Sequence, residues 1–126
     1  METADMVTLV LPKITATIDE LTLCRLSRKE QKRVRKFQRS MSKIGPLLIS
    51  KNKVIHIESA LCEIRRIIRH AEVWIEEKIT STIKHHLSAL LSYMDELEIL
   101  VQLELENHGI IPQILAGIKS LVSIFI

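Results

Sequence analysis

The sequence predicts an all-α protein, a compact bundle of about five helices with antiparallel neighbours and two long central helices. The 126 residues include only three glycines and three prolines, so few residues interrupt regular segments. Apolar side chains recur at steps of three and four along most of the chain, which is the spacing of one helix face. We therefore expect a single helical domain over residues 1–126, whose apolar last residues are typical of a truncated C-terminus.

The first predicted helix begins at Pro12, because proline suits the first turn of a helix. Ile14, Ile18 and Leu21 form its apolar face, and the pattern ends near Cys24. This cysteine and the other one in the chain both lie among apolar residues. We therefore expect two reduced, buried thiols.

A second helix is predicted after Ser27, which forms with Glu30 the Ser-x-x-Glu pattern of a capping box. In this motif the serine hydroxyl accepts a hydrogen bond from the glutamate amide, and the glutamate carboxylate accepts one from the serine amide. The apolar residues of this helix are Val34, Phe37, Met41 and Ile44. Gly45-Pro46 is expected to end it, since glycine favours a helix C-cap and proline cannot continue a helix.

The two long central helices are predicted from Val54 to a break at Thr80-Ser81-Thr82, and from near Ser81 to a stop at Asn107-His108-Gly109, with Asn52 and Ser81 as their caps. Apolar residues of the first alternate strictly between steps of three and four, as in a heptad seam. They are Val54, Ile57, Leu61, Ile64, Ile68, Ala71 and Ile75. Those of the second are Ile83, Leu87, Leu90, Met94, Leu97 and Val101.

A fifth helix is predicted from Pro112, and its segment from Ile110 to Ile126 carries one charge, Lys119. The segment is shorter than the ~20 apolar residues of a membrane-spanning helix. Its apolar residues also form one stripe, so we expect no membrane span. The acidic N-terminus, Met1–Asp5, is unlike a signal peptide, so we expect an intracellular protein.

Charge is distributed unevenly along the chain. Nine basic residues and one acidic residue lie between Arg25 and Lys43, whereas five acidic residues and no basic one lie between Asp95 and Glu106. The candidate basic face consists of Arg28, Lys29, Lys32, Arg33, Arg35, Lys36 and Arg39. Three interpretations stay open: a solvated face that partly neutralises the acidic end of the fourth helix, a nuclear-import or partner-docking signal, and contact with nucleic-acid phosphates.

The sequence contains no recognisable catalytic or metal site. Its five histidines form no His-Glu-x-x-His pattern, and the adjacent His85 and His86 project about 100° apart on a helix. It also lacks a glycine-rich phosphate loop and a cysteine–histidine nucleophile pattern. We therefore expect no enzymatic activity, no cofactor and no small-molecule substrate.

Residues 54–126 carry the spacing of a known family. The matching residues are Leu61–Arg66, Leu87–Leu90, Met94, Leu97, Ile99, Gly109–Ile111, Leu115, Ile118 and Lys119. This segment resembles the helical domain at the N-terminus of transcription elongation factor S-II and the related integrase-binding domain. The resemblance implies a nuclear docking module for short disordered motifs of transcription or chromatin factors. The chain departs from the family at Leu100-Val101 and at Pro112, and no partner-contact residue is carried over.

These observations lead to three hypotheses of function. The first is a non-enzymatic helical protein–protein interaction module, nuclear rather than cytoplasmic, with Trp74 either as a packing residue or as an interface anchor. The second is a self-assembling structural bundle, in which the heptad seam and the opposite charges pair between copies. The third is a basic nucleic-acid-binding accessory domain. In the basic segment only Phe37 is aromatic, and it lies on the apolar stripe, so base stacking has no candidate side chain.

Overall fold

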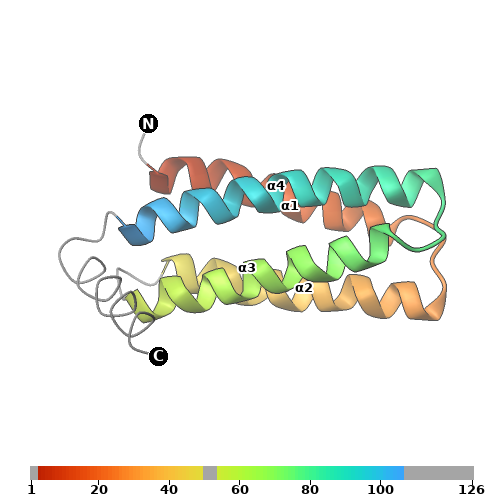
Figure 1. The fold of residues 1–126 in the computed structure, drawn as a ribbon, viewed down its shortest axis with the longest axis horizontal. Helices are drawn as coiled ribbons and strands as arrows, with labels where there is room; N and C mark the ends of the chain where they lie inside the picture. The colour runs from red at the N-terminus through yellow and green to blue at the C-terminus, as the bar shows by residue number, and fades with distance from the viewer. Residues whose placement is uncertain (1–2, 50–53, 107–126) are drawn as a thin grey trace, which may run out of the picture.

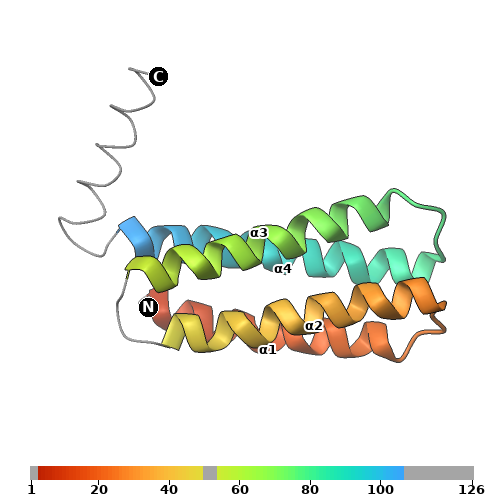
Figure 2. The ribbon, with the colours of Figure 1, turned by 90° about the horizontal axis from the view of Figure 1, so that it is seen from below.

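The computed structural model describes residues 3–49 and 54–106, which form four α-helices and no strand. The helices are α1 (Thr3–Thr22), α2 (Arg28–Ile49), α3 (Val54–Ile75) and α4 (Ser81–Glu106). They run alternately in opposite directions, with α1 and α3 each packed against both α2 and α4 (Figures 1 and 2). The predicted all-α class is confirmed. The described residues form four helices rather than the predicted five or so. The helix expected from Pro112 lies outside the described residues, as do the expected cap Asn52 and the expected stop at Asn107-His108-Gly109.

The core of the bundle is mostly aliphatic, with Phe37 and Trp74 as buried aromatic residues, and is formed by one stripe from each helix. In α3 the buried residues are Ile57, Ala60, Leu61, Ile64, Ile67, Ala71 and Trp74. In α4 they are Ile83, Leu87, Leu90, Met94, Leu97, Leu100 and Val101. Four of the seven predicted seam residues of α3 are therefore buried inside its own bundle, while Val54, Ile68 and Ile75 are half-buried.

The start of α1 differs from the prediction, because the helix begins at Thr3 and Pro12 lies inside it. Val7 and Val10 continue the apolar stripe of the helix and are 8% and 2% exposed. Burying each of these side chains stabilises the fold by roughly 1.5–3 kcal/mol. Together they offset the helix-interior cost of about 3 kcal/mol at Pro12, whose ring lies on the exposed side.

The expected end of α2 at Gly45-Pro46 is also wrong, since the helix continues to Ile49. Ile44 is fully buried, and Leu48, one turn further along, packs against the core. The exposed position of Pro46 keeps its ring out of this contact. The extra turn thus packs Leu48 against the core. The low helix propensities of proline and glycine do not include this tertiary contact.

The predicted helix starts agree better with the structure. Ser27 Oγ accepts a hydrogen bond from the Glu30 amide at 3.2 Å, and Glu30 Oε1 accepts one from the Ser27 amide at 3.0 Å, which confirms the capping box. The start of α4 at Ser81 is confirmed as well. Its cap is Thr80 rather than Ser81, because Thr80 Oγ1 accepts from the Ile83 amide at 3.3 Å.

None of the helices formed by residues 3–49 and 54–106 is long and apolar enough to cross a membrane. The apolar segment from Ile110 to Ile126 lies outside the described residues.

Candidate functional site

The basic residues of α2 cover the side of this helix that faces away from the core. Val34, Phe37 and Ile44 are buried, and at 100° per residue the cations between them project outward and to both sides. Of the seven predicted residues, only Arg33 is half-buried, while the other six are exposed. The predicted face is therefore a surface feature over the length of α2.

Five of the seven residues come together with α3 along a groove that holds two adjoining hollows of about 270 and 280 Å³. We call this surface the basic groove. Its polar and charged lining consists of Lys29, Lys32, Arg33, Lys36, Arg39, Ser40, Lys43, Arg66 and His70. Both hollows share Lys36 and His70, so these two residues mark its middle. None of the described residues that line it is acidic.

The other two predicted residues lie elsewhere on α2. Arg35 lines a separate hollow on the α1 side of the helix, together with Thr22 and Cys24. Arg28 lines neither hollow of the basic groove. The spacing of the charges along α2 does not show that Arg28 and Arg35 lie outside the groove. This depends on where α3 packs.

Three residues of the basic groove with basic side chains were absent from the predicted face. Lys43 continues the spacing of the α2 cations, four residues after Arg39, and this signal was present in the sequence. Arg66 and His70 come from α3 and reach the groove only because α3 packs beside α2. No local sequence pattern connects them with the basic segment.

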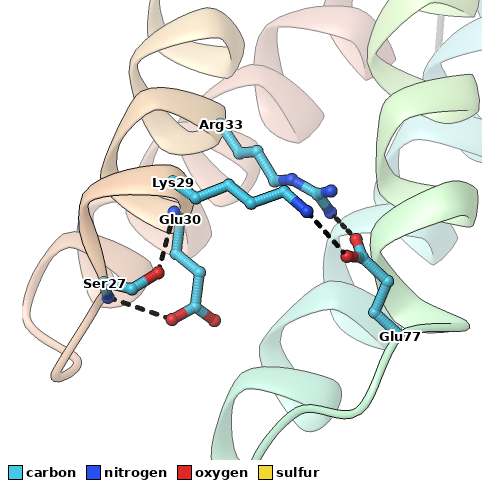
Figure 3. Close-up of polar contacts among 5 residues, drawn as sticks. All are labelled: Ser27, Lys29, Glu30, Arg33 and Glu77. Atoms are coloured by element: carbon cyan, nitrogen blue, oxygen red, sulfur yellow. Dashed lines mark hydrogen bonds and ion pairs between the residues drawn. The ribbon is translucent and has the colours of Figure 1, made fainter.

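One carboxylate pairs with two cations of the basic groove (Figure 3). Glu77, which follows α3, pairs with Lys29 at 3.3 Å and with the guanidinium of Arg33. The Arg33 hydrogen bond, followed by the hydrogen bond from Lys29, lowers the pKa of Glu77 below its usual 4.5. The Ser27–Glu30 capping box fixes the start of α2 just before these residues, so it positions Lys29 for the contact.

His70 lies among cations at the middle of the groove. Partial burial lowers its pKa from the usual 6.5, and the positive charges of Lys36, Arg69, Arg66 and Arg33 lower it further. An imidazolium at this position would add another positive charge beside these cations. The lowered pKa of His70 therefore reflects its partial burial first and the neighbouring positive charges second.

Among the described residues, no ion pair joins the acidic end of α4 to the basic face of α2. Glu98 of α4 pairs with Arg65 of α3 at 3.4 Å. The ion pairs of α2 go to Glu77 instead. The interpretation of α2 as a face neutralised by α4 is thus not supported by these contacts.

Comparison with protein-family models, with curated proteins and with solved structures finds no match to this chain. The resemblance of residues 54–126 to the elongation factor S-II domain therefore stays a prediction. Within the described residues, no group of three or more histidine, cysteine, aspartate or glutamate side chains is arranged to hold a metal ion.

Trp74 packs inside the bundle and is not a surface anchor. Its side chain is 1% exposed, and its ring stacks on Phe37 with a centroid separation of 6.0 Å and an interplanar angle of 29°. The guanidinium of Arg33 lies 5.7 Å from the ring centroid. The interface-anchor interpretation is wrong for this fold, because Trp74 lies on the side of α3 that packs against α2.

The cysteines are free, but their expected burial is also not met. Cys24 is half-buried and Cys62 is exposed on α3. The buried face of α3 contains Leu61 and Ile64. Cys62 lies between these residues in the sequence and projects to the side of this face, so it is exposed.

Proposed function

We propose that this chain is a non-enzymatic helical protein–protein interaction module that docks an acidic partner in the basic groove. The observation that supports this proposal is an unneutralised surface charge. Lys29 and Arg33 pair with Glu77, and Arg66 pairs with Glu63 at 3.2 Å. The described residues provide no ion pair for the remaining lysines and arginine of the groove, Lys32, Lys36, Arg39 and Lys43.

Such a concentration of like charge raises the free energy of the isolated fold and attracts an oppositely charged partner. A nuclear location and a partner among transcription or chromatin factors belong to the same proposal. The basic segment and the resemblance to the elongation factor S-II domain support them.

Nucleic acid is a second candidate partner, because the groove also suits phosphates. Phe37, which lines the groove, and Trp74, which packs against it, are both 1% exposed, so neither offers a surface for base stacking. Of the rings that line the groove, only the His70 imidazole is exposed, so contact would be mainly with the phosphate backbone. Self-assembly through the α3 seam has less support, because Ile57, Leu61 and Ile64 are buried in the chain's own core.

The experiment measures fluorescence anisotropy of a labelled glutamate-rich peptide and of a labelled DNA duplex at about 100 mM salt, where phosphate contacts still operate. We expect the peptide to bind and the K36E/R39E variant to lose this binding. Arg35→Glu is the matched control, since it makes the same charge change on the same helix but outside the groove. Tighter binding of the duplex than of any acidic peptide would favour the second candidate, and binding of neither would refute the proposal.

A further inference from the structure

We infer that the partner segment is an acidic α-helix that lies along the basic groove, with carboxylates spaced three and four residues apart. This inference rests on the proposed function and specifies the conformation and charge spacing of the partner. It depends on the geometry of the α2 cations, the floor of the groove, the contact made by Glu77 and the position of His70.

The α2 cations of the groove form a regular ladder. They are Lys29, Lys32, Lys36, Arg39 and Lys43, at alternating steps of three and four residues. At ~1.5 Å per residue, successive cations advance by about 4.5–6 Å along the helix, over about 21 Å in all. Side chains on one face of a second helix repeat at the same distances. Those on one face of an extended strand repeat every ~6.6–6.8 Å, so they lose register with the ladder.

The floor of the groove suits a helix with mixed polarity. Val73 is 63% exposed in the hollow next to Lys29 and Arg33, whereas Phe37 and Ile67 lie beneath the other hollow and are buried. The aliphatic stems of the lysines and arginines line the walls. A partner helix with one apolar residue opposite Val73 and acidic residues along its flanks would cover both hollows.

Glu77 shows how the groove holds a carboxylate. It accepts a hydrogen bond from Lys29 Nζ at 3.3 Å and pairs with Arg33, both of which line the first hollow. The side chain of Lys29 is 72% exposed and that of Arg33 is 22% exposed, so a partner carboxylate can reach both cations, Lys29 more readily. The charge of Glu77 competes with that partner, and removing the charge should strengthen binding.

His70 makes binding sensitive to pH. It faces Arg33 and Lys36 of α2 and lies near Arg66 and Arg69 of its own helix. Charged groups of α4, Asp95 and Glu98, line a different hollow on the other side of α3. Carboxylates bound in the groove would raise the pKa of His70 from its lowered value, so the complex would take up a proton. Affinity should therefore increase as pH falls from about 7.5 to about 6, above the range where glutamates protonate.

The test uses three labelled probes on the full chain. They are a helix-forming peptide of about 16 residues with glutamates at steps of three and four, the same peptide with two uncharged residues replaced by prolines that prevent a helix, and a DNA duplex. We expect the helical peptide to bind at least tenfold more tightly than the proline peptide. Circular dichroism should show its helicity rising on binding. The K36E/R39E variant should lose at least tenfold in affinity. Arg35→Glu should change it by less than about twofold, since Arg35 is exposed and lines a different hollow of α2.

Two further variants test the groove without removing a cation. Glu77→Gln should increase affinity for the helical peptide by about two- to fivefold, as expected for releasing an exposed ion pair. His70→Gln should remove most of the pH dependence of binding, and the NMR titration of His70 should move to higher pH in the complex. Both substitutions are on the surface, so folding can be verified by unchanged circular dichroism.

The possible failures are distinguishable. Equal binding of the helical and proline peptides would overturn the inferred helix while leaving the proposed function intact. Binding of the duplex alone would overturn both. Salt-sensitive self-association that is lost in K36E/R39E and also in D95K would assign the groove to the acidic α4 of a second copy, and would overturn the inference of a separate partner.

Discussion

Trp74 connects the core of the bundle to the basic groove. One face of its ring stacks on Phe37, and Arg33 lies over the ring before reaching Glu77. A single buried side chain thus holds α2 against α3 and helps to orient a cation at the groove. Its role is structural, although its position influences the surface.

At Trp74, replacement by alanine should destabilise the fold by about 3–5 kcal/mol, because a large buried side chain leaves a cavity. Val73→Ala is the matched control on the same helix. Val73 is 63% exposed, so its truncation should cost less than about 0.5 kcal/mol. Chemical denaturation measures both values, and equal effects of the two substitutions would contradict the packing described here.

The capping box at the start of α2 allows a second prediction for single residues. Ser27→Ala should cost about 1 kcal/mol, because the Glu30 amide loses its acceptor. Ser42 is the control, since its hydroxyl donates to the Arg39 carbonyl inside the helix and caps nothing. Ser42→Ala should change stability by less than about 0.5 kcal/mol. A double-mutant cycle with Glu30→Ala should show coupling, and strictly additive effects would mean that the reciprocal bonds do not act together.

At the scale of elements, two helices continue through residues that usually end them. Pro12 lies within α1, and Gly45-Pro46 lies within α2. In both cases the turns on the far side of the proline carry apolar residues that pack in the core. They are Val7 and Val10 before Pro12 in α1, and Leu48 after Pro46 in α2. Tertiary burial outweighs local propensity at these positions, because each propensity term is no larger than the burial of one or two side chains.

This arrangement predicts the sign of a substitution at Gly45. A Cβ added there meets no atom within 4 Å, and the residue lies inside a helix. Gly45→Ala should therefore stabilise the protein by about 0.5–1 kcal/mol, through the lower backbone entropy of alanine in the unfolded chain. The midpoint of thermal or denaturant unfolding reports this change. A loss of stability would instead indicate a left-handed cap at Gly45, as the sequence alone had suggested.

At the scale of the whole molecule, the order of packing separates the charges. α2 packs between α1 and α3, and the acidic end of α4 pairs with α3 through Arg65 and Glu98. The positive surface of α2 therefore stays exposed beside α3. This separation of charge favours a partner over internal neutralisation.

Because the α3 seam is already buried, the isolated chain should be a monomer. Light scattering should give a mass near 14.5 kDa that does not change with concentration. A mass that rises with concentration at high salt would point to apolar self-assembly instead. A rise only at low salt would point to pairing of opposite charges between copies.

The sequence by itself determined the helical class, the start of α3, the start of α4 and the capping box at Ser27. These features depend on apolar spacing within one helix or on hydrogen bonds between residues three apart, so they can be read locally. It also indicated the basic face of α2, but not which of those residues share one groove.

Only the tertiary structure decided the extent of α1 and α2, the burial of Trp74 and the composition of the basic groove. Each of these depends on which helices pack together, through contacts between residues far apart in the chain. Arg66 and His70 join the α2 cations because α3 lies beside α2, while Arg35 faces the α1 side of the same helix. Helical periodicity gives the angle of a side chain around its own axis, and the packing of the bundle determines what lies at that angle.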